Sequence, residues 1–354
     1  RAPSRRIRLA RSAASLCRKR ITSAPERRQP SYMLAWQSAS STFGGGGIWT
    51  SWLNWNQNGQ VPSSITLGKS TNTKGITFDA PISAAGPIYA YGGNIAVNAN
   101  ITATGGDILL DADTGSTLSQ STSGISLASN VIVKTLTSGD ITMIGRSGNA
   151  NASLDGINTT TGVKIDSVGN ISLTGYSYAT NTTGGSRGID IVGTTTIKAG
   201  GSLSMVGQHA ASSSYAVSLD ALSTVSSGNG ITLESLNNTA GYVYLATNLN
   251  GGSGDVVITG ANIGLPTTAR TITTSGKITI QPDADEASFA TALSTQYLSF
   301  SSTATGLTLG RSGNSQTITI FNQQSIAGPI NVYAGNIYLG AGLSSTGASS
   351  GISL

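Results

Sequence analysis

The side chains that most often catalyse reactions or bind metals are scarce in this chain. It has one histidine, His209, and one cysteine, Cys17, among 354 residues. A Ser-His-Asp triad would have to use His209, but its surroundings, VGQHAASSSYA, contain no nucleophile signature. A single cysteine excludes a disulfide framework and a thiolate metal site. We therefore interpret His209 as an exposed side chain in a polar corner, without a catalytic role.

Carboxylates are the other candidates for chemistry. Asp111 and Asp113 alternate along one predicted strand face, and Asp283, Asp285 and Glu286 form the densest acidic group. Groups of this kind could bind calcium or provide the paired acids of a glycoside hydrolase. Aspartate also favours turns and helix caps, and we adopt that structural interpretation for both groups.

Three further patterns fall short of a ligand site. Residues 251–255 (GGSGD) come closest to the calcium-binding nonapeptide GGxGxDxUx, but this run stands alone. A polysaccharide lyase needs aspartates grouped with cations, yet Lys69 and Lys74 are the nearest cationic pair after residue 30. Threonine runs such as 194–196 do not recur in register, as ice-binding rows would. We predict no catalytic, cofactor-binding or metal-binding residue, no cofactor and no enzyme activity.

One short phrase recurs from about residue 61, and it predicts the elements that carry these side chains. A glycine and a small or polar residue precede apolar residues at every second position, for example at 93–97, 139–143 and 335–339. This alternation places the apolar side chains on one face of a β-strand. Asn or Asp after the glycine tolerates the positive φ of a tight corner. Fifteen such starts imply about 18 residues a coil, which favours a parallel β-helix over a propeller with blades of 40–50 residues.

A long internal repeat supports the same architecture. Residues 66–105 return at 308–347 without a gap, at a fixed offset of 242, with 19 of 40 positions identical. Stacked coils bury a continuous apolar column that no single coil could bury alone. At about 4.8 Å a coil, residues 61–354 would build a rod of roughly 80 Å. We predict an all-β parallel β-helix (solenoid), with a repeat unit of 242 residues that restarts near residue 308.

Charge separates the chain into parts. Residues 1–30 hold ten Lys/Arg and one acid, Glu26, whereas residues 31–354 hold ten Lys/Arg and fourteen Asp/Glu, a net charge of −4. We interpret residues 1–30 as a disordered basic head. It is either a basic arm for nucleic acid or an anionic surface, or non-native sequence, and the second interpretation is favoured. Residues 31–60 contain all four tryptophans and form an irregular lead-in or early coils. Residues 283–296 lose the alternation, and a capping box from Asp283 to Glu286 predicts one short helical insertion there.

The repeated body resembles that of filamentous-haemagglutinin-like exoproteins, on the residues ITLGKSTNTKGITFDAPISAAGPIYAYGGNIAVNANITATGGDILL and their echo at 307–347. The resemblance covers about residues 61–354. It implies a right-handed β-helix in a Gram-negative adhesin that is exported by two-partner secretion through an outer-membrane partner. The secretion domain of that family has no counterpart here.

The resulting hypothesis is a secreted or cell-surface, non-enzymatic stalk or contact surface. Its partners would be host or environmental surface glycans or proteins, with no nucleic acid and no small-molecule substrate. A carbohydrate-active β-helix enzyme or tailspike-like depolymerase is the alternative, and an ice- or surface-binding β-helix is a further one.

Overall fold

The computed structural model describes residues 47–52, 61–113, 121–179, 185–210, 215–236, 241–283, 285–347 and 350–354. Within these ranges the chain forms parallel strands and one short 3-10 helix, η1 (Thr50–Trp52). The predicted basic head and most of the lead-in lie outside the described residues. Among the described residues, no helix has the length and apolar character that crossing a membrane requires.

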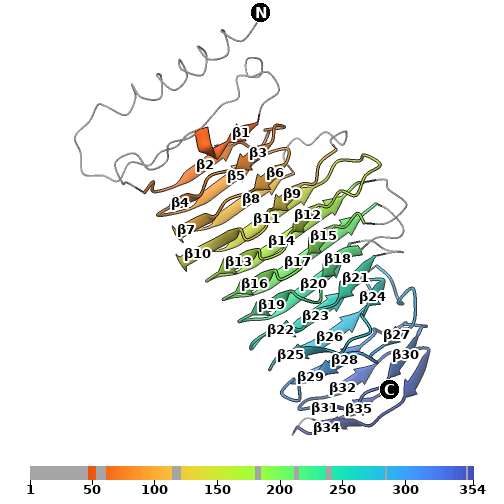
Figure 1. Ribbon diagram of the computed structural model, residues 1–354. Helices are drawn as coiled ribbons and strands as arrows, with labels where there is room; N and C mark the ends of the chain where they lie inside the picture. The colour runs from red at the N-terminus through yellow and green to blue at the C-terminus, as the bar shows by residue number, and fades with distance from the viewer. Residues whose placement is uncertain are drawn as a thin grey trace, which may run out of the picture. The chain divides into compact units, whose positions relative to one another are not determined.

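Three long sheets form most of the coil array (Figure 1), and each coil up to β25 contributes a strand to sheet B, then to sheet A, then to sheet C. Sheet B contains β2 (Ile65–Gly68), β5 (Ile88–Tyr91), β8 (Ile108–Ala112), β11 (Ile141–Arg146), β14 (Ile171–Ser177), β17 (Leu203–His209), β20 (Ile231–Ser235), β23 (Val256–Thr259), β26 (Lys277–Gln281), β29 (Gly306–Leu309), β32 (Ile330–Val332) and β35 (Ile352–Ser353). Sheet A contains β1 (Ile48–Trp49), β3 (Ile76–Phe78), β6 (Ile95–Val97), β9 (Ile125–Leu127), β12 (Ile157–Thr159), β15 (Ile189–Ile191), β18 (Tyr215–Leu219), β21 (Tyr242–Leu245) and β24 (Asn262–Gly264). Sheet C contains β4 (Ile82–Ala84), β7 (Ile101–Gly105), β10 (Ile132–Ser138), β13 (Lys164–Ser167), β16 (Thr196–Ala199), β19 (Thr224–Ser227), β22 (Leu249–Asn250), β25 (Arg270–Thr273) and β28 (Leu298–Phe300).

Two smaller sheets take over in the last coils. One contains β27 (Leu293–Ser294), β30 (Thr317–Ile320) and β33 (Asn336–Leu339), and the other contains β31 (Gln324–Ile326) and β34 (Leu343–Ser345). Where sheet C stops, the buried side chain of Gln324 replaces the strand pairing. Its carbonyl oxygen accepts the Phe300 N–H at 3.2 Å, and its amide donates to the Leu298 carbonyl at 3.3 Å. The chain is thus a parallel β-helix, as predicted.

The core is a set of stacked apolar columns. In sheet B, Ile108 pairs with Ile141, which pairs with Ile171, and the column continues through Leu203 and Ile231. All five side chains are fully or almost fully buried. Burial of each contributes about 1.5–3 kcal/mol, and it requires the coils on both sides.

Each coil is longer than the sequence suggested. From Ile65 to Leu307 the sheet B column takes nine steps over 242 residues, which is about 27 residues a coil. The predicted 18 was wrong because the glycine starts at 93–97 and 139–143 belong to different sheets, A and B, of different coils. The eleven steps from β2 to β35 span about 53 Å, less than the expected 80 Å.

Asp and Asn at the corners act differently from the prediction. The side chain of Asp107 accepts the N–H of Asp140 in the next coil at 2.9 Å, and that of Asp140 accepts the N–H of Asn170 at 2.7 Å. Asn170 does the same for Ser202 at 2.8 Å. Before Asp107 and Asp140, the positive φ belongs to the preceding glycines, Gly106 (135°) and Gly139 (111°). These side chains therefore connect coil to coil.

The described residues of 283–296, which are all but 284, contain no helix, so the predicted helical insertion was wrong. The Glu286 N–H donates to the Asp283 carbonyl at 3.0 Å in a turn, and the strand β27 follows. Phe289 is buried in the core, and the Ala290 N–H donates to the Ala261 carbonyl of the preceding coil at 2.8 Å. These contacts fix this segment against the preceding coil in a non-helical conformation, and they outweigh the local capping signal.

Residues 47–52 begin the array. β1 pairs in parallel with β3, with Ile48 opposite Ile76. The Ser51 N–H and the Thr50 hydroxyl both donate to the Asp79 carboxylate, at 2.7 and 3.1 Å. These six residues therefore form part of a coil.

Candidate functional site

Four of the eleven connections that leave sheet B strands are longer than any other connection from β2 onward, and the remaining seven have two to seven residues. The four long ones, at 113–124, 147–156, 178–188 and 282–292, have 12, 10, 11 and 11 residues. From β2 onward, connections that leave the sheet A side have three to five residues, and those that return to sheet B have two to six. Insertions in a solenoid collect on the face that binds, because loops tolerate variation while the coils do not. We call the connections between β8 and β21 on this side, with the strand ends they join, the projecting corner.

Close backbone contacts that involve glycine lie at the base of three successive connections of the projecting corner. A Cβ added to Gly145 would lie 2.1 Å from the Gly156 carbonyl oxygen, and one added to Gly175 would lie 2.1 Å from that of Gly188. In the next coil, Gly207 would meet the Ala216 carbonyl oxygen at 1.9 Å. The strand that leaves sheet B and the strand that begins sheet A are therefore in backbone contact. Ten or more residues can project beyond this contact without disturbing the core.

Beyond the glycine pairs, a small polar interior holds the connections together. The Ser177 hydroxyl donates to the Leu154 carbonyl at 2.6 Å, and the Tyr178 N–H donates to the Ser147 hydroxyl at 3.0 Å. His209, expected to be exposed, is only 2% exposed at the end of β17. It is buried because its strand overshoots the corner and lies beside Ser177 of the preceding coil.

Arg146 organises one aromatic cluster on this corner. It forms an ion pair with Asp113 of the preceding coil. Its guanidinium carbon lies 5.6 Å from the ring centroid of Tyr176 and 5.0 Å from that of Tyr178, both in the following coil. The two rings are stacked, with centroids 6.5 Å apart. Cation–π contacts of this kind stabilise by about 0.5–1 kcal/mol at exposed sites and fix the arginine in place.

Arg187 organises a second cluster one coil further on. It pairs with Asp190 at 2.5 Å, and its guanidinium carbon lies 5.5 Å from the ring centroid of Tyr215. Tyr215 stacks on Tyr244 at 4.9 Å and meets Tyr242 edge-on at 6.0 Å. All three rings are partly exposed. Since Arg187 comes from the coil before Tyr215 and Tyr244 from the coil after, we infer that they occupy opposite faces of its ring, and we call this set the tyrosine–arginine ladder.

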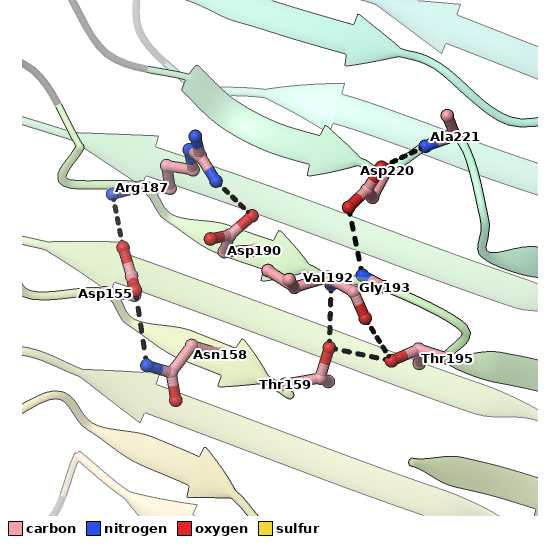
Figure 2. Close-up of polar contacts among 10 residues, drawn as sticks. All are labelled: Asp155, Asn158, Thr159, Arg187, Asp190, Val192, Gly193, Thr195, Asp220 and Ala221. Atoms are coloured by element: carbon pink, nitrogen blue, oxygen red, sulfur yellow. Dashed lines mark hydrogen bonds and ion pairs between the residues drawn. The ribbon is translucent and has the colours of Figure 1, made fainter. Parts of the chain in front are cut away.

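Two carboxyl groups lie beside the ladder (Figure 2). Asp155 is 7% exposed, and burial raises its pKa to about 7, with further upward pressure from the charge of Asp190. Its oxygens accept the main-chain N–H of Arg187 at 2.8 Å and the Asn158 amide at 3.3 Å. Burial also raises the pKa of Asp190, opposed by the Arg187 guanidinium and by a hydrogen bond from Ser218. The oxygens of both acids are thus occupied by protein donors, which favours a tie between coils over acid–base catalysis.

The structure separates the acids that the sequence singled out. Asp113 belongs to the projecting corner, where it pairs with Arg146. Asp111 precedes it in β8 and accepts its N–H at 3.0 Å; burial raises the pKa of Asp111. Asp283 and Glu286 lie in the 282–292 connection, several coils away, and their carbonyls accept hydrogen bonds from Arg311 at 2.8 and 3.4 Å.

The remaining predicted patterns have structural roles. Asp255 of the 251–255 run accepts the Lys277 N–H at 2.7 Å, as the other corner acids do. Lys69 and Lys74 lie in the short connection between β2 and β3, away from the clusters. No group of three or more His, Cys, Asp or Glu side chains suited to a metal ion occurs in the described part of the chain.

Sequence reasoning missed the residues that converge here, above all Arg146, Asp155, Arg187 and Asp190. One signal was available. Five of the eleven tyrosines fall between residues 176 and 244, at the edges of the widest gaps between predicted strands.

Comparisons with protein-family models, with curated proteins and with solved structures found no significant match to this chain.

Proposed function

We propose that this chain is a segment of a secreted or surface-displayed bacterial adhesin, in which the coil array is the scaffold and the projecting corner is the contact surface. One observation carries the proposal. Three long connections, 113–124, 147–156 and 178–188, leave the array over consecutive coils, and partly exposed tyrosines and arginines gather at their ends and on the two coils that follow. Tyrosine and arginine are enriched at binding surfaces because they offer large contact area and hydrogen bonds at low entropic cost.

Surface glycans or surface proteins of a host or an environmental substrate are the partners that fit this role. The tyrosines of the ladder are partly exposed, and a tyrosine side chain combines an apolar ring with a hydroxyl that can hydrogen-bond. Repetition of the corner over successive coils would add avidity to weak individual contacts. Export through an outer-membrane secretion partner belongs to the same proposal and rests on the family resemblance.

Binding of the whole chain to a glycan array and to immobilised surface proteins tests this function. The double variant Tyr215→Ala/Tyr244→Ala should lower the apparent affinity about tenfold or more, the size expected for central contact residues. Tyr338→Ala is the matched control, because Tyr338 is 70% exposed but lies on β33, outside the corner. Equal losses in the two variants, or none in the double variant, would contradict the assignment.

A carbohydrate-active enzyme is the second candidate, and one observation favours it. Asp155 and Asp190 place two acids of raised pKa beside aromatic rings on one face. Release of reducing ends from a polysaccharide by the intact chain, abolished in Asp190→Asn, would replace the adhesin proposal with this one.

A further inference from the structure

Asp155 connects two successive connections of the projecting corner. It lies at the end of the 147–156 connection, and its carboxyl oxygen accepts the main-chain N–H of Arg187, at the end of the 178–188 connection, at 2.8 Å (Figure 2). Its other oxygen accepts the Asn158 amide from β12. Its own N–H donates to the Ser123 hydroxyl of the preceding coil at 3.1 Å. One side chain therefore ties together elements of consecutive coils.

Arg187 is the residue that this tie positions. Its main chain is held by Asp155, while its guanidinium reaches Asp190 at 2.5 Å and the Tyr215 ring. Arg187 is the first member of the tyrosine–arginine ladder. A shift of residues 185–188 would consequently change the start of the ladder.

We propose that the carboxyl group of Asp155 is a pH-sensitive latch, closed when protonated, that holds Arg187 and its neighbours in residues 185–188 in place on the projecting corner. Asp155 is only 7% exposed in the closed state, so its ionised form gains solvation by water when residues 185–188 move away from it. The latch is therefore closed at mildly acidic pH and opens more often as the pH rises.

The charged surroundings support this direction. From β15 and the residues before it, Asp155 faces the Arg187 guanidinium and the Asp190 carboxylate. Asp220, in the connection after β18, faces Asp190 and raises its pKa further. The partners of Asp155 on β12 and in the preceding coil are the neutral side chains of Asn158 and Ser123. The Arg187 guanidinium already pairs with Asp190, and its single positive charge does not compensate a second buried carboxylate. The ionised form of Asp155 is therefore disfavoured in the closed state.

An exchange experiment on the whole chain tests the latch. The amide hydrogen of Arg187 exchanges only when its bond to Asp155 opens, so its exchange rate divided by the intrinsic rate gives the opening constant. Between about pH 5 and pH 7 we expect this constant to rise roughly tenfold or more in the natural chain. In Asp155→Asn it should stay flat, because the amide oxygen still accepts the hydrogen bond and nothing titrates.

Asp140→Asn is the matched control. Asp140 also accepts a main-chain N–H of the next coil, from Asn170 at 2.7 Å, but in an exposed position. This variant should keep the pH dependence at Arg187. A flat response in the natural chain, or a persistent one in Asp155→Asn, overturns the proposal. If Asp155→Asn does not fold, a carbon-13 titration of the Asp155 carboxyl group in the natural chain decides; a midpoint near 4 overturns it.

An effect of the latch on binding rests on the proposed function, whereas the latch itself does not. If hydrogen exchange at Arg187 does not depend on pH but binding still depends on the tyrosines, the latch proposal alone is contradicted. If the exchange depends on pH but no binding is found, the adhesin proposal alone is contradicted.

Discussion

Asn72 and Asn314 lie 242 residues apart and make the same hydrogen bond. Each buried side-chain amide donates to the main-chain carbonyl of a tyrosine nineteen residues later, Tyr91 or Tyr333, at 2.8 Å. Each follows a glycine with left-handed φ, Gly68 at 72° or Gly310 at 78°. The sequence period is therefore nine whole coils. It returns β2 and β5 to β29 and β32 of the same sheet B, whereas the equivalents of β3 and β4 are β30 and β31 of the two smaller sheets.

The paired asparagines allow a stability prediction. Asn72→Ala and Asn314→Ala each remove a partly buried hydrogen bond to a main-chain carbonyl, which costs about 0.5–1.5 kcal/mol. Urea unfolding followed by circular dichroism measures the loss. Because nine coils separate the two sites, the double variant should lose the sum of the two single losses. Unequal losses, or a double variant no worse than either single one, would show that the two corners are not equivalent.

The glycine pairs at the base of the projecting corner predict a sharp steric response. Gly145→Ala places a methyl group 2.1 Å from the Gly156 carbonyl oxygen, and the backbone must move. We expect a loss of about 1–3 kcal/mol, typical of overpacking, measured as a lower midpoint of thermal unfolding. Gly342→Ala is the control, since nothing lies within 4 Å of its added Cβ. A tolerated Gly145→Ala would mean that the strands do not touch at this point.

The buried acids predict an unusual dependence of stability on pH. The pKa of Asp155 rises from 3.8 to about 7 on folding, so between these values the folded chain binds the proton that the unfolded chain releases. The stabilisation is complete below about pH 4 and is lost as the pH rises through about 7. The pKa of Asp190 is also raised on folding, so this acid likewise stabilises the fold more at low pH than at high pH. The difference between the folded and unfolded pKa values of Asp155 corresponds to at most about 4 kcal/mol of unfolding free energy.

Chemical denaturation at several pH values checks this sign. The natural chain should unfold at a higher urea concentration at about pH 5 than at about pH 8. Asp155→Asn should reduce the difference by raising stability at the higher pH. A natural chain that gains stability toward pH 8 would show that other groups outweigh Asp155.

Local sequence features account for the strands but not for the site. Alternation at residues 139–143 predicted β11 and its buried face, because period 2 is a property of a single strand. The length of a coil could not be obtained in the same way, because the glycine-containing sequence before a strand of sheet A follows the same pattern as that before a strand of sheet B. Phe289 shows the other limit, because its burial in the array overrides the capping box at Asp283. Asp155 and Arg187 are 32 residues apart, and only the correct coil length brings them together.

The outer face of sheet C carries a charge pattern that this coil length also explains. Lys134 pairs with Asp166, and Asp166 pairs with Lys198, so opposite charges alternate in register on three consecutive coils. Asp166→Lys would place three like charges directly opposite one another, which costs roughly 0.2–1 kcal/mol for each pair. Asp166→Asn should cost less, because it removes attraction without adding repulsion. The difference between the two variants should shrink in about 1 M salt, where the screening length falls to about 3 Å. Thermal unfolding at low and high salt measures it, and a salt-independent difference would assign the loss to packing instead of charge.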